Sequence, residues 1–138
     1  MQGKIKNCWI IDDDPIFIYG TKRIMKDVEF SEAVAVYNNG QDALEKLNEL
    51  LLVNAPIPGI ILLDLNMPIM TGWEFLDHFM AAVPERKILN NTQIYVVSSS
   101  VDPRDLEKVK EYGAVKGYIS KPVTPNDLEV ILGTVPVT

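Results

Sequence analysis

The sequence predicts an α/β fold in which five parallel strands alternate with five helices. Short apolar runs recur along the chain, and a longer segment with helix-start signals follows each of them. At least three of the runs are continuously apolar, as expected of parallel strands that are covered on both faces. Strict alternation of strand and helix favours right-handed crossovers. We therefore expect a (βα)₅ unit built as one doubly wound parallel sheet.

The expected strands are the five apolar runs, and the last of them is the weakest. They lie near residues 5–11, 33–37, 59–64, 94–98 and 115–120. Each expected helix opens with a residue that can cap it, followed by proline or glycine. The openings are Asp14-Pro15, Asn39-Gly40, Thr71-Gly72, Asp102-Pro103 and Thr124-Pro125. In the fourth helix, Leu106, Val109 and Tyr112 form the apolar side, and we expect Gly113 to end it.

Length and charge narrow the classes of function. The 138 residues suit one domain, 1–138, with no output domain. The net charge of −6 and the lack of a Lys/Arg cluster argue against nucleic-acid binding. No apolar run approaches the roughly 20 residues of a membrane span, and the start lacks a signal-peptide core, so we expect a cytoplasmic protein without membrane insertion. Cys8, the only cysteine, is expected to be a buried, inert thiol.

Polar residues follow the apolar strands directly. Asp12 and Asp13 follow the first strand, Asp64 the third, Ser98 the fourth and Lys121 the fifth. In an open α/β sheet these positions share the carboxyl edge, where ligands bind at the switch point of the strand order. If that order is 2-1-3-4-5, a common one for such sheets, the crevice lies between the two strands that carry the acids.

Three carboxylates in one crevice repel each other, and a hard divalent cation resolves the repulsion. Mg²⁺ binds a few carboxylate or carbonyl oxygens and retains several waters. It also neutralises phosphoryl oxygens during transfer to a carboxylate nucleophile. The ammonium of Lys121 and the hydroxyl of Ser98 would contact further phosphoryl oxygens. The pattern therefore indicates a magnesium-dependent phosphoryl acceptor.

Each of these signals also has a purely structural explanation. A pair of acids after a strand, such as Asp12-Asp13, often forms only a turn, and so does a Lys-Pro pair such as Lys121-Pro122. A run of serines, such as residues 98–100, is often only a polar loop. Asp14 is better explained as a helix cap and stays outside the site, and His78 suits a surface or packing role. The functional interpretation rests on four strand ends that carry compatible chemistry in the right order.

These motifs resemble the receiver domains of bacterial response regulators. The resemblance covers essentially the whole chain and implies a single-domain receiver with a flavodoxin-like fold. The matching pieces are Ile10-Ile11-Asp12-Asp13-Asp14-Pro15, Leu62-Leu63-Asp64-Leu65-Asn66-Met67-Pro68 with Gly72, Val96-Val97-Ser98-Ser99-Ser100, and Gly117-Tyr118-Ile119-Ser120-Lys121-Pro122.

The resemblance implies the metal site and the phosphoacceptor. Asp64 is similar to the residue that accepts the phosphoryl group. Asp13 corresponds to the direct Mg²⁺ ligand, and Asp12 assists through water. Asn66 would offer its backbone carbonyl to the metal, and together with Ser100 it would flank the path of the hydrolytic water.

The resemblance also implies a switch and its partners. Ser98 matches the switch hydroxyl, Tyr118 the switch aromatic and Lys121 the site lysine, followed by a cis bond to Pro122. A histidine kinase or histidine phosphotransfer protein would supply the phosphoryl group, and an unknown downstream protein would read the signal. Such a protein is not an enzyme with a separate substrate, although it catalyses its own phosphorylation and dephosphorylation.

The chain departs from the family pattern at three places. One residue is added between Gly113 and Lys121, which predicts a modified approach to the fifth strand. The segment from Asp64 to Ser98 is longer, with the extra residues expected in the loop 84–92. The helix after Thr124 is expected to be short, which would alter the partner surface.

Three rival functions remain open. A phosphatase of the haloacid dehalogenase type needs an acid two residues after its nucleophile, where this chain has Asn66. An FMN-binding module needs a loop rich in hydroxyls and glycine after the first strand, where this chain has the acids 12–14. A degenerate receiver would keep the fold as a scaffold that is never phosphorylated.

Overall fold

The computed structural model describes residues 5–84, 92–99 and 102–134. Five parallel strands form one sheet in the order β2-β1-β3-β4-β5, which confirms the predicted α/β class and strand order. The strands are β1 (Ile5–Ile11), β2 (Ser31–Tyr37), β3 (Ile60–Asp64), β4 (Gln93–Ser98) and β5 (Val115–Ser120).

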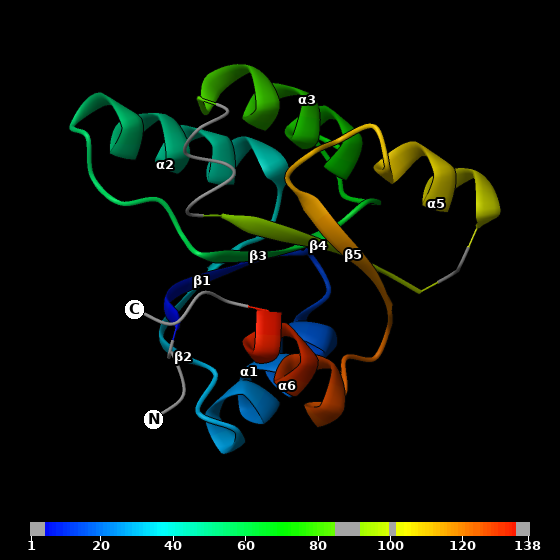
Figure 1. Ribbon diagram of the computed structural model, residues 1–138. Coiled ribbons are helices and arrows are strands. Elements are labelled where there is room, and N and C mark those ends of the chain that lie inside the picture. The colour runs from blue at the N-terminus through cyan, green and yellow to red at the C-terminus, as the bar shows by residue number, and fades with distance from the viewer. Residues whose placement is uncertain (1–4, 85–91, 100–101, 135–138) are drawn as a thin grey trace.

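Helices cover both faces of the sheet (Figure 1). On one face lie α1 (Pro15–Asp27) and α6 (Pro125–Thr134). On the other lie α2 (Gly40–Leu52) and α3 (Gly72–Ala82), with α5 (Pro103–Val109) at the end of this layer, beyond α3. These five helices of the described ranges begin where the capping pairs predicted.

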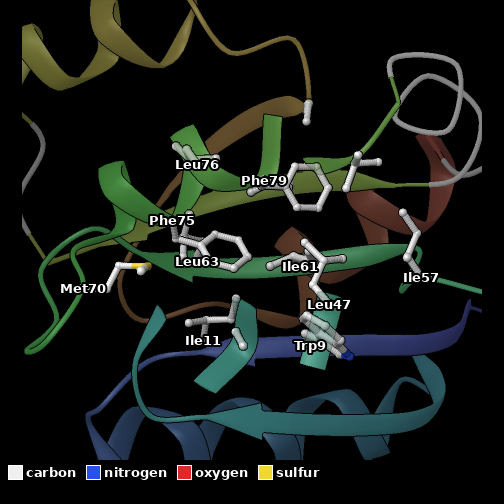
Figure 2. Close-up of a cluster of buried hydrophobic side chains, with 14 of the residues drawn as sticks. Trp9, Ile11, Leu47, Ile57, Ile61, Leu63, Met70, Phe75, Leu76 and Phe79 are labelled. Atoms are coloured by element: carbon white, nitrogen blue, oxygen red, sulfur yellow. The ribbon is translucent and has the colours of Figure 1, made fainter. Parts of the chain in front are cut away.

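The strands alternate their side chains between two apolar cores. Trp9 and Ile11 of β1 face α2 and α3, whereas Cys8 and Ile10 belong to the core under α1 and α6. Figure 2 shows the first of these cores. Its fully buried members include Leu47, Ile61, Leu63, Phe75, Leu76 and Phe79. Strand β3 is buried along its whole length, so it is the centre of the fold.

The prediction that the fourth helix runs to Gly113 is wrong. Helix α5 ends at Val109, and the next backbone N–H groups, up to that of Tyr112, each donate to the carbonyl three residues back. These tighter turns bring Tyr112 to α3. Its hydroxyl donates to Asp77 Oδ1 at 2.8 Å, and its ring centre lies 6.0 Å from that of Trp73. A contact distant in sequence therefore accompanies the early end of the helix.

The extra residue before Lys121 forms a bulge in β5. Val115 lies opposite Ile94, but Gly117 lies opposite the next residue of β4, Tyr95, so that Lys116 is the added residue. A Cβ atom at Gly117 would lie 2.9 Å from the Tyr95 ring, so glycine is needed there. The predicted change in the approach to the fifth strand is thus a one-residue bulge.

Several smaller expectations can also be compared with the structure. Cys8 is fully buried, and burial raises the pKa of its thiol. His78 is exposed on α3. The last helix has ten residues within the described range. Residues 85–91 of the lengthened loop and Ser100 lie outside the described residues. None of the helices in the described ranges is long and apolar enough to cross a bilayer.

Candidate functional site

Asp12 and Asp13 lie where β1 ends. Asp12 is buried, and its backbone N–H donates to the carbonyl of Tyr37 at 2.9 Å, which extends the β1–β2 ladder by one bond. Its Oδ1 accepts the N–H of Asp14 at 2.9 Å. Asp13 is exposed. Asp14 accepts the N–H groups of the first turn of α1, so its interpretation as a helix cap is confirmed.

Asp64 is the last residue of β3 and lies opposite Val97 of β4. The strand before it is apolar and covered on both faces, so the carboxyl group emerges at the edge of the core with only 6% of the residue exposed. Its Oδ1 accepts the backbone N–H of Asn66 at 3.2 Å. The side chain of Asn66 is exposed.

The three acids converge as the sequence predicted. One carboxylate oxygen from each of Asp12, Asp13 and Asp64 lies within 4.8 Å of the other two. Burial is the largest cause that raises the pKa of Asp64, to about 6, and the charge of Asp12 raises it further. The N–H of Asn66 and the ammonium of Lys121 lower the same pKa without cancelling these effects.

Among the described residues, Lys121 is the only one whose ammonium group contacts this cluster. Its Nζ lies 2.9 Å from Asp12 Oδ2 and 3.8 Å from Asp64 Oδ2. Its backbone N–H donates to the carbonyl of Ser98 at 2.8 Å, which joins the ends of β4 and β5. The bond from Lys121 to Pro122 is cis, as predicted.

The donor set fits a hard divalent cation. Asp12 Oδ2 is buried, and its partner among the described residues is the Lys121 ammonium, with which it forms an ion pair. A single ammonium opposite three carboxylates leaves a net negative charge in a partly buried space. Asp13 keeps the cluster open to solvent, which suits an ion that retains water.

The two predicted switch residues lie on neighbouring strands. Ser98 is buried at the end of β4, one residue beyond the partner of Asp64. Tyr118 lies opposite Val96 and is half-buried against a small apolar cluster that includes Leu65 and Val109. Since Leu65 directly follows Asp64, this cluster connects the acidic edge to α5.

Sequence reasoning missed two contacts that shape the site. The Nζ atom of Lys121 lies 4.4 Å from the centre of the Phe17 ring on α1, so this ring packs against the ammonium that contacts the acids. Gly72 presses against the backbone after β3, because a Cβ atom there would lie 2.5 Å from the carbonyl oxygen of Asp64. The Gly72 N–H also donates to the carbonyl of Leu65 at 2.9 Å. Gly72 stood in a recognised motif, but nothing local revealed this contact.

The family model described as "response regulator receiver domain" matches residues 8–132. The chain belongs to the receiver domain family of response regulators. The receiver is similar to the nitrate/nitrite response regulator protein NarL of Escherichia coli, with 34% identity over 119 residues. That match covers 86% of this chain and 49% of NarL, so the receiver spans about half the length of this relative.

Two further relatives support the same assignment. The chemotaxis protein CheY of Listeria monocytogenes is 38% identical over 80 residues, which cover 58% of the receiver and 61% of CheY. The crystal structure of a two-component response regulator from Cytophaga hutchinsonii superposes with a TM-score of 0.84 and 35% identity, covering 94% of the receiver and 96% of that chain. The general function of the family is that of a phosphoacceptor switch in two-component signalling.

Proposed function

We propose that this receiver accepts a phosphoryl group on Asp64 in a reaction that depends on Mg²⁺. The observation that carries the proposal is the convergence of Asp12, Asp13 and Asp64 within 4.8 Å, with Lys121 in ion-pair contact. The donor would be a histidine kinase or a histidine phosphotransfer protein. A cytoplasmic location and an unidentified downstream protein partner remain part of the proposal.

The residues divide the chemistry between them. A carboxylate oxygen of Asp64 attacks phosphorus, and the Lys121 ammonium neutralises a phosphoryl oxygen as the new bond forms. Ser98, which is buried at the end of β4, would donate its hydroxyl to another phosphoryl oxygen. Asp12 and Asp13, with the carbonyl of Asn66, would hold Mg²⁺, which supplies charge neutralisation when it is bound. We propose no separate substrate that is turned over.

Phosphorylation would transmit the signal by changing the populations of two conformations of the receiver. Contact of Ser98 with the phosphoryl oxygens would open space beside the end of β4, into which Tyr118 turns. Tyr118 packs with Val109 of α5, so a change in its rotamer alters the face formed by α5 and β5. Phosphorylation then favours one of two pre-existing states, which a partner protein can distinguish.

Intact-mass measurement tests this proposal. The full chain is incubated with acetyl phosphate and Mg²⁺, and we expect the wild type to gain one phosphoryl group. Asp64→Asn should gain none, and chelation of Mg²⁺ should prevent the gain in the wild type. Asp27→Asn, an exposed acid at the end of α1, is the matched control and should behave as the wild type.

The rival functions predict other results. A wild type that stays unmodified with Mg²⁺ would contradict the proposal and favour a scaffold that is never phosphorylated. Continuous hydrolysis of an added phosphate ester, p-nitrophenyl phosphate, would favour a phosphatase. A bound yellow chromophore in the purified protein would favour an FMN-binding module.

A further inference from the structure

The two edges of the sheet differ in how they are protected. Among the described residues, β2 and β5 each pair with a strand on one side only (Figure 1). At β5, the bulge at Lys116 interrupts the regular pairing, and bulges and lysines discourage the addition of a further strand. Strand β2 pairs with β1 in one constant register, and Glu32 is its only charged residue. The β2 edge therefore lacks these two forms of protection.

A groove lies beside β2, between this strand and α1. Its volume is about 860 Å³. Val36 and Asn38 line it on the strand side. Ile18 and Tyr19 line it on the helix side, and Tyr19 is 69% exposed. Side chains of a strand alternate between the two faces of a sheet, so an extended segment laid along the β2 edge directs every second side chain towards this groove.

Three cations of α1 line the same groove. They are Lys22, Arg23 and Lys26, and all three are exposed. None of them forms an ion pair with a described residue, whereas four cations elsewhere in the described ranges do. Asp27 also borders the groove and offsets one of the three charges. In a chain of net charge −6, this side of α1 is therefore a locally positive surface.

The other face of β2 has a different charge environment. Ala35 and Tyr37 pack against the core under α2 and α3. Burial raises the pKa of Tyr37, and the charge of Glu49 on α2 raises it further, so this acid lies near the end of β2. Glu49 is itself paired with Lys46 at 3.7 Å. A segment on the β2 edge would thus meet unpaired cations on the α1 face and a paired acid on the α2 face.

We propose that the β2 edge binds an extended acidic segment of a partner protein. The segment adds a strand to the sheet and directs alternate acidic side chains into the groove beside α1. Main-chain hydrogen bonds to β2 supply affinity, and ion pairs with Lys22, Arg23 and Lys26 supply the preference for acids. This binding does not require phosphorylation of Asp64.

Two other occupants fit this surface less well. If a second copy added its own β2 in the antiparallel direction, the two-fold axis would place both α1 helices on the same face of the joined sheet. The cations of the two helices would then repel each other. A nucleic acid would also meet the cations, but the net charge of −6 repels its phosphates over the rest of the protein. The charges therefore favour an acidic protein segment.

Fluorescence anisotropy with labelled peptides tests the proposal on the full chain. The probe is a short peptide in which glutamate alternates with threonine, a residue that favours strands. It should bind more tightly than a peptide with lysine in place of glutamate, and more tightly than one with the same composition but all glutamates in one block. A peptide with the same side chains and an N-methylated backbone should not bind, because it cannot donate main-chain hydrogen bonds to β2. Equal binding of all four peptides, or no binding of the probe, would overturn the proposal.

Two double variants separate the groove from the net charge of the protein. Lys22→Gln combined with Lys26→Gln should weaken binding of the probe about fivefold, the effect expected for the loss of two exposed ion pairs. Glutamine is a good helix former, so α1 should stay folded. Lys110→Gln combined with Lys116→Gln removes the same charge near the opposite edge and should leave binding unchanged. Equal losses in the two double variants would contradict a site beside α1.

Hydrogen exchange locates the bound peptide. Amide hydrogens of residues 31–37 should exchange more slowly when the probe is bound, whereas those of residues 115–120 should not change. Unchanged exchange in β2 would overturn the addition of a strand even if the probe binds. A dimer with protected β2 amides in the absence of probe would assign the edge to a second copy, and tighter binding of a single-stranded oligothymidine would assign the groove to nucleic acid. Either result would also overturn the proposal.

Discussion

The centre of the sheet and its carboxyl edge differ sharply in the chemistry of their buried side chains, although the two regions are only one residue apart along β3. In β3, the residues from Ile60 to Leu63 are apolar and at most 1% exposed, between layers of helices. The next residue, Asp64, is also buried, but beside two other acids, and its pKa is raised to about 6. The centre stabilises the fold, whereas burial and the charge of Asp12 make it costly to keep Asp64 ionised at the edge. Such local cost is typical of functional sites.

The comparison also shows how the edge is supported. Helix α3 contributes Phe75, Leu76 and Phe79 to the core, and its first residue, Gly72, contacts the backbone of Asp64. The same helix therefore stabilises the centre and packs against the backbone of Asp64. Substitutions along α3 and at the edge should separate these two contributions.

The largest effect is expected from the core. Phe75→Ala removes a fully buried ring from the cluster in Figure 2 and should reduce the free energy of unfolding by about 3–5 kcal/mol. Chemical denaturation measures the loss. Phe75→Leu, which keeps most of the apolar volume, is the matched control and should lose much less. A loss below about 1 kcal/mol for the alanine variant would show that the centre is not the stabilising region.

Gly72→Ala tests the junction between the two regions. Its Cβ atom would lie 2.5 Å from the carbonyl oxygen of Asp64, so the backbone must shift. We expect a loss of about 1–3 kcal/mol and slower phosphorylation by acetyl phosphate. Gly113→Ala, where a Cβ atom meets nothing within 4 Å, should change neither quantity by a comparable amount. Equal effects in the two variants would argue against close packing at Gly72.

The smallest predicted effect is a gain in the free energy of unfolding, whereas the two preceding variants lose stability. The folded-state pKa of Asp64 is about 6 against an ordinary 3.8, so the folded protein favours the protonated acid. Ionisation therefore reduces stability progressively as the pH rises from about 4 to above 6. Without divalent cations, Asp64→Asn should be more stable than the wild type at pH 7.5, because it removes the buried charge. We expect a difference of only about 1 kcal/mol, because water at the open rim weakens the repulsion between the acids.

Denaturation at two pH values with a chelator measures this effect. The advantage of Asp64→Asn should shrink towards pH 4, where the acid is protonated in the folded wild type and no longer carries a buried charge. Added Mg²⁺ should stabilise the wild type at pH 7.5, because an ion that binds only the folded state raises its stability. An Asn variant less stable than the wild type at pH 7.5 would contradict the view that the edge is strained by charge.

Most of the fold and the acid cluster could be predicted because they follow from local patterns. Apolar runs marked the strands, and the capping pairs marked the start of each helix that the structure describes. Because parallel strands end at one edge, the residues after them had to converge, and Asp12, Asp13 and Asp64 do so. The end of α5 at Val109 was missed, because the turns that follow lead to a contact between Tyr112 and Asp77, far apart in sequence.

The sequence alone determined the order of elements, the edge at which chemistry is possible and the residue types available there. The tertiary structure decided that Phe17 packs against Lys121, that Gly72 meets the backbone of Asp64 and that the cations of α1 line a groove beside β2. Periodicity and capping act over a few residues and are visible in the chain. Close approach, burial and pKa depend on which distant segments meet when the two helical layers pack on the sheet.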